Sequence, residues 1–419
     1  MWTKKSISLI SLGIFSLLFG LALADYQVEL LGTVIIFYVF FRSLRNIPKI
    51  HMEKKISKTK SFEGEYIEFE NNLICNNNSP LLAQIYDKVS DRMLITSGTN
   101  RLTLPIEKSK KWRMKYTTLT PLRGYHLVGP IKVRAWDYSF LFYNEFEIGN
   151  ENEIAVYPFL GDVKMAEVWG QVDRYYPGEH LTKKPGTSTE FLSIRDYVKG
   201  DPWKWINWKA SCKEKKLMVN QYEKENICDL YIVIDARQSN LLGTVASNAL
   251  EYSIKAAAEI ALFFIKKRNQ VGLIIYNDVV STVKPGSGMK HFTELLTALT
   301  NAYGRGNMTA GAALEMIMPY MNPKTTIIFF SGLEYDPTIS TTITKLKLRG
   351  HRLIIVSPSP IDFEVSAAGY YSYRHMLVRL ERTNFIDELR TVGVEVIDWK
   401  PEESVEVILK RCRGVGKGR

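Results

Sequence analysis

The sequence has few of the residues that hold metal ions, form disulfides or build recognisable catalytic sites. It contains four cysteines and six histidines in 419 residues, and no histidine falls in a metal-ligand pattern. The cysteines lack a CxxC or other ligand spacing, so free thiols in a reducing compartment are expected for Cys75, Cys212, Cys228 and Cys412. No Walker loop, zinc-protease helix, nucleophile–base motif or paired-carboxylate signature is present. The sequence alone therefore points away from most familiar enzyme classes.

The chain also has little net positive charge between residues 61 and 409. Its formal net charge is +11, but residues 42–60 and 410–419 account for the whole surplus. A nucleic-acid-binding groove would need its surplus on a folded face, so nucleic-acid binding is disfavoured. The length leaves room for two or three domains, and 46% apolar residues is ordinary for globular cores.

Two uncharged apolar runs stand at the amino terminus, at residues 7–24 and 30–41. The first is long enough to span a bilayer and the second is short against the ~20 residues usually needed. Lys4 and Lys5 precede the pair, Arg42 follows it, and acids lie in the turn, which predicts a two-pass anchor with cytoplasmic termini and soluble domains facing the cytoplasm. LALA before Asp25 also resembles a signal-peptide cleavage site, and this alternative stays open.

The rest of the chain changes character near residue 225. Residues 62–160 alternate in short runs between turn residues and predict a β-sandwich-like domain of about seven strands. Residues 226–412 alternate strand with helix, with helices expected at 249–268, 289–302, 310–320, 337–349 and after 400, and predict an α/β doubly wound, Rossmann-type domain. We expect a transmembrane hairpin at 1–45, a basic linker at 46–61 lying against anionic headgroups, a connecting segment at 161–225 and a basic tail at 413–419.

In such sheets, functional groups gather beyond the carboxyl ends of the strands. Residues 235–239, Thr309 and residues 331–336 should therefore share one rim. An apolar strand ending in Asp235, a helix start at Thr309 and a strand ending in Ser331 together resemble a von Willebrand factor A domain. The resemblance implies a metal-ion-dependent adhesion site, in which Asp235, Ser239 and Thr309 would bind Mg²⁺ through oxygen ligands.

The match to that metal site is partial. Arg237 replaces the first serine, and Gly332 stands where a second aspartate is expected, although Glu334 or Asp336 could reach in. Arg237 beside Asp235 would favour the ionised carboxylate and repel a dication. We therefore expect a degenerate site with no cofactor or weakly bound Mg²⁺. In the alternative interpretation, Asp235 caps the following segment and Arg237 is solvated.

The segment before the α/β domain carries a long signature, GTSTEFLSIRDYVKGDPWKWINWKASCKEKKLMVNQYEKE. It resembles the family catalogued as domain of unknown function 58, with Asn207 in place of an aspartate and Trp203 and Trp205 in an arginine-rich position. The matching residues are Gly186, Glu190, Phe191, Arg195, Asp196, Tyr197, Gly200, Asp201, Ile206, Trp208, Lys209, Ala210, Ser211, Leu217, Val219, Tyr222 and Glu223.

Three tryptophans lie within six residues of this signature, at Trp203, Trp205 and Trp208. If the segment is extended, the first two share one flank and could fasten the sandwich to the sheet. Alternatively they form an exposed surface for a partner, because tryptophan is a common anchor in interfaces.

The family resemblance implies a membrane-anchored adaptor that works with a MoxR-type AAA+ ATPase in assembling or maturing client proteins. Through the rim residues Arg237, Glu334 and Asp336, the α/β domain would bind the ATPase or a client, and the hairpin would contact membrane lipid. We expect no enzymatic activity. An envelope-associated hydrolase is the alternative, and a nucleic-acid-binding protein is a further one.

Overall fold

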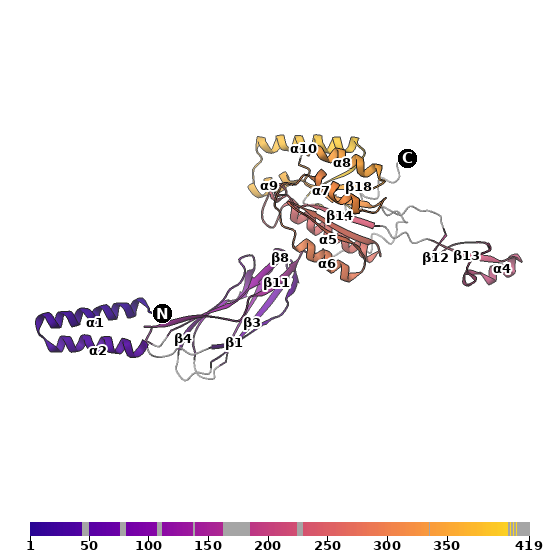
Figure 1. Cartoon of the computed structure of the whole chain (residues 1–419). Coiled ribbons are helices and arrows are strands. Elements are labelled where there is room, and N and C mark those ends of the chain that lie inside the picture. Colours follow the sequence, from indigo (N-terminus) through magenta and orange to yellow (C-terminus); the bar gives the residue numbers. More distant parts are fainter. Residues whose placement is uncertain are drawn as a thin grey trace. The chain divides into compact units, whose positions relative to one another are not determined.

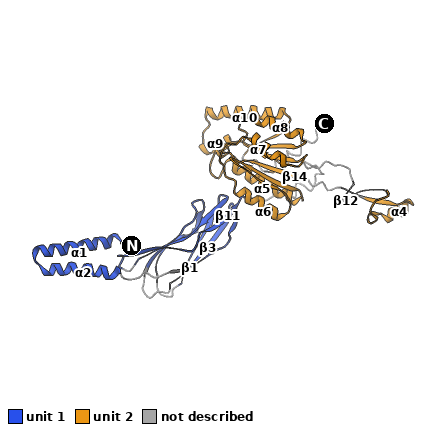
Figure 2. Ribbon diagram, viewed as in Figure 1, with its two compact units in different colours: residues 1–159 blue, residues 160–419 orange. Residues whose placement is uncertain are grey.

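The structure is a computed structural model, and it describes residues 1–43, 50–75, 81–106, 111–136, 139–161, 185–223, 229–334 and 336–400, with 403, 405 and 408. The chain forms two compact units, residues 1–159 and 160–419 (Figure 2). The expected basic tail lies outside the described residues, as does most of the expected last helix.

Unit 1 begins with two antiparallel helices, α1 (Lys4–Leu23) and α2 (Tyr26–Ser43), joined by a two-residue turn (Figure 1). Thr3 caps α1 by accepting a hydrogen bond from the Ser6 amide, and Ala24 ends it in a left-handed conformation. Both helices are long and apolar enough to cross a membrane. The second helix is longer than its apolar run because flanking residues, among them Tyr26 and Arg42, join it.

The rest of unit 1 is rich in strands. They are β1 (Ile50–Ile56), β2 (Lys60–Phe62), β3 (Tyr66–Cys75), β4 (Leu81–Asp87), β5 (Leu94–Gly98), β6 (Arg101–Ile106), β7 (Lys111–Leu119), β8 (Gly124–Val128), β9 (Ile131–Trp136), β10 (Tyr143–Ile148) and β11 (Asn152–Tyr157). Their sheets have the orders β1-β3-β7-β5, β10-β9-β4-β6 and β2-β11-β8. Alternate side chains from all three sheets fill one apolar core that includes Phe69, Ile85, Val133 and Ile154.

This region contains more strands than the seven or so predicted. The long alternating run from residue 112 to 136 is divided into β7, β8 and β9 by turns at Pro121 and at Gly129–Pro130. Proline cannot donate to a sheet ladder, and Gly129 has a positive φ, so each site ends a strand.

The basic linker predicted at 46–61 is wrong for most of its length, because β1 and the start of β2 lie there. Lys54 does not face lipid headgroups. Its ammonium group is 2.7 Å from the Asp87 carboxylate, which has no exposed side-chain surface. Asp87 also accepts hydrogen bonds from Asn71 (2.8 Å) and Tyr116 (2.6 Å). Burial lowers the pKa of Lys54 although Asp87 opposes that shift.

Unit 2 contains a six-stranded sheet in the order β16-β15-β14-β17-β18-β19. All neighbours pair in parallel except β15 and β16, which are antiparallel, so the sheet is mixed. The strands are β14 (Asp229–Asp235), β15 (Gln270–Tyr276), β16 (Val280–Gly286), β17 (Thr326–Phe330), β18 (Arg352–Pro358) and β19 (Glu395–Trp399).

Helices cover both faces of this sheet (Figure 1). α5 (Ala249–Lys266) and α6 (Met289–Thr300) lie on one face, and α7 (Ala310–Ile317), α8 (Pro337–Leu348) and α10 (Tyr373–Thr391) pack on the other. The four predicted helices between residues 249 and 349 are confirmed. The sequence had assigned no structure to α9 (Pro360–Ala368) and α10, because α10 exposes apolar side chains such as Leu377 and Leu380 and its apolar period is weak.

The signature segment forms its own small motif. β12 (Pro185–Asp196) and β13 (Met218–Glu223) pair antiparallel, with the 3₁₀ turn η1 (Trp203–Trp205) and α4 (Trp208–Glu214) between them. The tryptophans therefore do not share a flank of an extended segment, which corrects that expectation. Trp203 is 71% exposed and Trp208 is 60% exposed.

Candidate functional site

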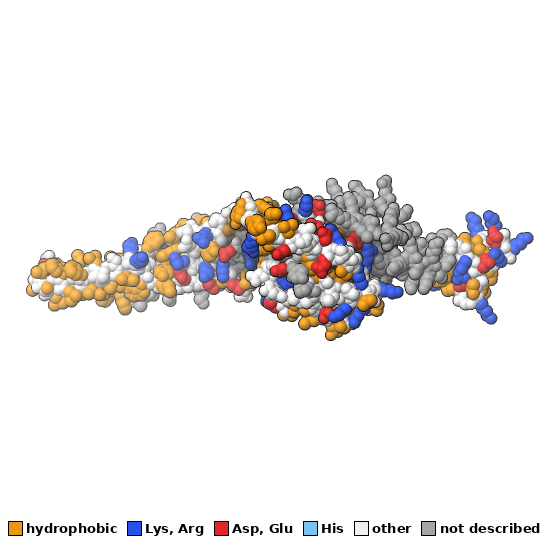
Figure 3. Space-filling view, turned by 90° about the horizontal axis from the view of Figure 1, so that it is seen from above, with side chains coloured by type: hydrophobic (Ala, Val, Ile, Leu, Met, Phe, Trp, Pro, Cys, Tyr) orange, Lys and Arg blue, Asp and Glu red, His pale blue; other side chains and the backbone are white. Residues whose placement is uncertain are grey.

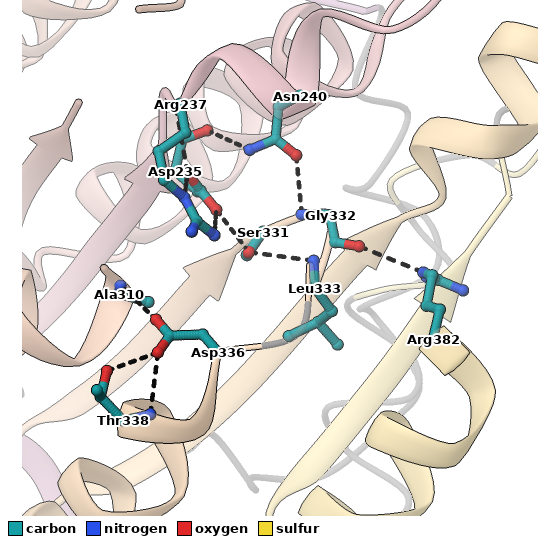
Figure 4. A network of polar contacts seen from close by, with 10 residues as sticks. All are labelled: Asp235, Arg237, Asn240, Ala310, Ser331, Gly332, Leu333, Asp336, Thr338 and Arg382. Atoms are coloured by element: carbon teal, nitrogen blue, oxygen red, sulfur yellow. Dashed lines mark hydrogen bonds and ion pairs between the residues drawn. The ribbon is translucent and has the colours of Figure 1, made fainter. Parts of the chain in front are cut away.

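The candidate site lies at the rim formed by the carboxyl ends of β14 and β17. Asp235 ends β14 and Ser331 directly follows β17, and parallel pairing brings them together. The Ser331 hydroxyl donates a 2.7 Å hydrogen bond to Asp235 Oδ2 (Figure 4). Asp235 is 2% exposed and Ser331 is equally buried, so this contact forms in a setting of low dielectric.

Arg237 binds the same carboxylate with two parallel hydrogen bonds. Its Nε donates to Asp235 Oδ1 at 2.9 Å, and its NH2 donates to Oδ2 at 2.7 Å. The Arg237 side chain is 8% exposed, so the predicted Arg–Asp pair is confirmed and a solvated arginine is excluded. Burial alone would lower the pKa of the guanidinium, but the hydrogen bonds and charge of Asp235 outweigh it, and the pKa is raised.

Asn240 links the ends of β14 and β17 through two hydrogen bonds. Its Nδ2 donates to the Asp235 carbonyl oxygen at 3.0 Å, and its Oδ1 accepts from the Gly332 amide at 3.1 Å. A β-carbon on Gly332 would lie 2.5 Å from Pro360 Cγ and closer still to Asn240. The position where an aspartate was expected is therefore too crowded for any side chain.

Asp336 comes close to the predicted Thr309 loop but serves as a structural cap. Its Oδ2 accepts from the Ala310 amide at 2.8 Å, and its Oδ1 accepts from the Thr338 amide and hydroxyl. It is 4% exposed, so a single buried carboxylate stabilises the amino-terminal ends of both α7 and α8.

The remaining predicted site residues are not joined to Asp235. Thr309 caps α7 through the Ala312 amide at 3.3 Å, and Ser239 is half-buried in the turn η2 (Gln238–Leu241). Neither makes a hydrogen bond to Asp235 in the described part of the chain. Glu334 is exposed, and its charge adds to the influences that raise the pKa of Arg237.

The carboxylate oxygens at this rim are not free to bind a magnesium ion. Both oxygens of Asp235 bind Arg237, and both oxygens of Asp336 accept hydrogen bonds from protein groups. Across the described residues, no group of three or more His, Cys, Asp or Glu side chains is arranged to hold an ion. A hard dication needs several free oxygens, and here an arginine already supplies the positive charge.

The sequence analysis missed two residues of this network, Asn240 and Arg382. Arg382 lies on α10, is 8% exposed, and donates to the Gly332 carbonyl oxygen (3.3 Å) and to Ser357 Oγ (2.8 Å). It also pairs with Asp398 at 2.7 Å. No local sequence pattern predicts that an arginine on a helix is buried, so Arg382 can be identified only from its contacts in the structure.

Loops around the rim expose apolar side chains. The loop after α6 pairs with the loop after β14, since the Arg305 amide donates to the Ala236 carbonyl (3.0 Å) and the Gln238 amide to the Gly306 carbonyl (3.2 Å). Side chains between 37% and 68% exposed line these loops and the β15–β16 turn: Leu241, Leu242, Val245, Val279 and Tyr303. Such a surface can bind another protein.

Several signature residues build the β12–β13 motif itself. Arg195 donates to both carboxylate oxygens of Asp201 at 2.7 Å, and these hydrogen bonds lower the pKa of Asp201. Asn207, which departs from the signature's aspartate, caps α4 by accepting from the Ala210 amide at 3.0 Å. Ser211 binds the Met218 amide at 2.8 Å and closes the motif.

Together these features define a protein with two apolar amino-terminal helices, a strand-rich region and an α/β domain with a buried polar network at its rim. Residues 193–357 match the family described as "Protein of unknown function DUF58". This confirms the predicted resemblance.

Known relatives carry no functional name. The "Uncharacterized protein YeaD" of Bacillus subtilis (strain 168) is 21% identical over 296 residues, which cover 69% of this chain and 70% of that protein. The "Uncharacterized protein Rv1480" of Mycobacterium tuberculosis (strain ATCC 25618 / H37Rv) is 25% identical over 31% of this chain and 41% of its own length.

Among solved structures, similarity is slight. The cupredoxin domain of amoB from Nitrosocaldus yellowstonii is 13% identical with a TM-score of 0.20, over 26% of this chain and 90% of that chain. A type II cohesin domain from Acetivibrio cellulolyticus is 9% identical with a TM-score of 0.20, over 26% and 95% respectively. Similarity at this level supports no conclusion about fold or function.

Proposed function

We propose that this chain is a membrane-anchored interaction protein whose α/β unit resembles a von Willebrand factor A domain and binds a protein partner at its rim without a metal ion. The observation that carries the proposal is the buried Arg237–Asp235 pair. It gives the rim a fixed shape and charge where a metal-dependent domain would need an ion.

The exposed apolar surface of the hairpin supports membrane anchoring. Apart from a narrow seam, the side chains of α1 and α2 are uncovered, as with Phe15 (65%) and Phe37 (64%), and hydrophobic side chains dominate the visible face of the hairpin (Figure 3). A core helix of a soluble protein would be mostly buried instead. A bilayer is the environment in which such a surface is stable.

Small residues in the hairpin seam fit the same interpretation. Ser6, Gly13 and Gly20 recur every seven residues on α1 and are its buried positions, and Gly32 faces them from α2. A β-carbon on Gly32 would lie 2.7 Å from the Gly13 carbonyl oxygen. Close backbone approach through small residues is typical of helix pairs in membranes.

Charge at the hairpin ends favours cytoplasmic termini. Lys4 and Lys5 lie at the start of α1 and Arg42 at the end of α2, whereas Asp25 and Glu29 lie at the opposite turn. Under the positive-inside rule, the domains that follow face the cytoplasm. In that orientation the proposed rim would be within reach of a cytoplasmic ATPase.

The strand order of the sheet supports the assignment of a von Willebrand factor A-like domain. The class of partner follows from the resemblance to the domain of unknown function 58 family. The order β16-β15-β14-β17-β18-β19 with an antiparallel β16 is the arrangement expected of a von Willebrand factor A-like domain. We propose a MoxR-type AAA+ ATPase as the partner, acting with this chain on client proteins. The apolar loops beside Arg237 supply the contact surface.

Purification of tagged full-length chain from gently solubilised native membranes tests this function. The Tyr303→Ala variant removes an exposed aromatic ring at the rim, and Tyr320→Ala is the matched control because Tyr320 is 83% exposed at the opposite end of the sheet. We expect an AAA+ ATPase with the wild type and with Tyr320→Ala, in Mg²⁺ and in chelator alike, and less with Tyr303→Ala.

Three results would contradict the proposal. They are the absence of any ATPase, equal losses from both tyrosine variants, or loss in chelator while the ATPase itself stays assembled. The last would mean that the rim binds through an ion after all.

A further inference from the structure

The first three residues of the chain are part of the strand-rich fold. The Met1 ammonium group donates to the Tyr143 carbonyl at 2.7 Å, the Tyr143 amide donates back to Met1, and the Thr3 amide donates to the Leu141 carbonyl at 3.1 Å. Trp2 forms an antiparallel bridge with Phe142, and their rings meet edge to face at 5.1 Å. Residues 1–3 therefore pair antiparallel with residues 141–143, where β10 begins, before α1 starts.

The β9–β10 loop also packs against the open end of the hairpin. Leu141 (1% exposed) and Phe142 (9%) form an apolar cluster with Val39 on α2, and Leu9 on α1 packs against it. Lys5 adds a hydrogen bond to the Ser139 carbonyl at 3.3 Å. The hairpin and the strand-rich region are thus joined by residues from both helices as well as by the chain itself.

Helix length fixes where this junction lies if the hairpin spans a bilayer. The 20 residues of α1 measure about 30 Å, which is the thickness of the hydrocarbon core. Residues just before Lys4 must then lie at the level of the lipid headgroups. Trp2, two residues before the helix, is 50% exposed there.

Phe140 has the features of a second lipid contact. It is 45% exposed in the same loop, and its φ of 58° is unusual for a bulky residue. Strain of this kind persists where the surrounding structure or a function requires it. Lys4, at the start of α1, and Arg42, in the last turn of α2, lie at the same end of the hairpin.

We propose that Trp2 and Phe140 form a lipid-binding surface that seats the strand-rich region directly on the headgroup layer of a membrane containing anionic phospholipid. The inference rests on the proposed membrane anchoring. The aromatic rings insert at the interface, as tryptophan does at the ends of membrane spans, and the cations face the phosphates. The hairpin and the strand-rich region then move as one body on the membrane surface.

Site-specific fluorescence in proteoliposomes tests this surface. The full-length chain, with its four cysteines replaced by alanine, carries Phe140→Cys labelled with an environment-sensitive dye and is reconstituted into phosphatidylglycerol–phosphatidylcholine vesicles. Leu127→Cys is the matched control, since Leu127 is 51% exposed on β8. Trp2→Cys is a second test position in case the loop variant fails to fold.

The labels at Phe140 and Trp2 should lose most of their emission to a quencher carried on lipid, whereas the label at Leu127 should respond only to aqueous iodide. If the labels at Phe140 and Trp2 respond as Leu127 does, no lipid covers the loop and the inference is overturned.

Alkaline extraction of the same vesicles separates the two proposals. If the protein is extracted, the anchoring is wrong and this inference falls with it. If it stays in the membrane while the Phe140 label remains in water, only the lipid-binding surface is wrong.

Discussion

At the scale of single residues, the rim is governed by one buried ion pair. Asp235 lies deep at the end of β14, and Arg237 supplies a rigid two-pronged donor that matches both carboxylate oxygens. Forming such a pair adds little net stability, because both charges lose water. Removing one partner is costly, because it strands the other charge in a low dielectric.

Replacing Arg237 should therefore destabilise the chain and create a response to magnesium. Arg237→Ser leaves Asp235 unpaired, and we expect the free energy of unfolding to fall by about 3–5 kcal/mol. The new hydroxyl supplies the first serine that a metal-ion-dependent adhesion site would have between Asp235 and Ser239. Mg²⁺ should therefore recover part of that loss by binding the folded state. Thermal unfolding of the purified chain with and without Mg²⁺ measures both effects.

Arg305→Ser provides the control for this prediction. Its guanidinium lies 3.8 Å from Asp278, and both side chains are more than half exposed, so its loss should cost no more than about 1 kcal/mol. Equal effects of the two serine variants, or an Arg237→Ser variant indifferent to Mg²⁺, would show that Arg237 does not stand in for an ion.

A buried histidine in unit 1 should make stability depend on pH. Burial is the main cause that lowers the pKa of His126, Arg92 acts in the same direction, and the Leu122 carbonyl at 2.9 Å opposes them. The unfolded chain therefore takes up a proton first as the pH falls below about 6.5. The part of the folding free energy that depends on neutral His126 is full above that pH. It declines as the pH falls toward the folded-state pKa of His126.

NMR titration of histidine-labelled protein should give His126 a midpoint below that of the unfolded chain. Unfolding measured at several pH values should show a smaller acid-side loss in His126→Gln than in the wild type. An unchanged slope would mean that His126 is not the group responsible.

At the scale of elements, the hairpin depends on close backbone contact between α1 and α2. Gly32 would place a β-carbon 2.8 Å from the Leu17 amide nitrogen, and backbone cannot rotate away as a side chain can. Ser16 adds a hydrogen bond across the pair to the Val28 carbonyl at 2.9 Å. The two helices can therefore pack this closely because the glycines have no side chain.

Enlarging a seam glycine should separate the two helices. Gly32→Leu should destabilise the detergent-solubilised hairpin by about 1–3 kcal/mol, the usual cost of overpacking, and expose the turn at Asp25 to protease. Ala22→Leu is the control, because Ala22 is exposed on α1. Comparable cleavage of both variants would contradict the packing shown by the glycines.

At the scale of the whole molecule, the chain divides into two compact units. Unit 1 joins the apolar hairpin to the strand-rich region, and unit 2 carries the signature motif and the rim. In the proposed membrane anchoring, the orientation of the hairpin decides which side of the membrane the rim faces. Cys212, a free and exposed thiol on α4, gives a natural reporter of that side.

A membrane-impermeant maleimide should not label Cys212 in intact cells. It should label the thiol after the cells are permeabilised, because the proposed cytoplasmic termini would place unit 2 inside. The Cys212→Ser variant identifies the part of the signal that comes from this residue. Labelling of Cys212 in intact cells would reverse the proposed topology.

Much of the architecture could be predicted from local patterns. The apolar runs gave the helical hairpin, and strand–helix alternation gave the α/β sheet with Asp235 at its rim, because both depend on residue order within short windows. The extra strands of unit 1 and the helix α10 escaped prediction. Their patterns are interrupted by turns in one case and by exposed apolar residues in the other.

Sequence by itself determined that a buried strand ends in Asp235 with Arg237 two residues on, that the amino terminus is apolar, and that the signature resembles a family that residues 193–357 match. Tertiary structure alone decided that Asn240 and Pro360 fill the space at Gly332, that Asp336 caps two helices, and that residues 1–3 pair with β10. Those contacts join residues far apart in the chain, so no local pattern of propensity or spacing encodes them.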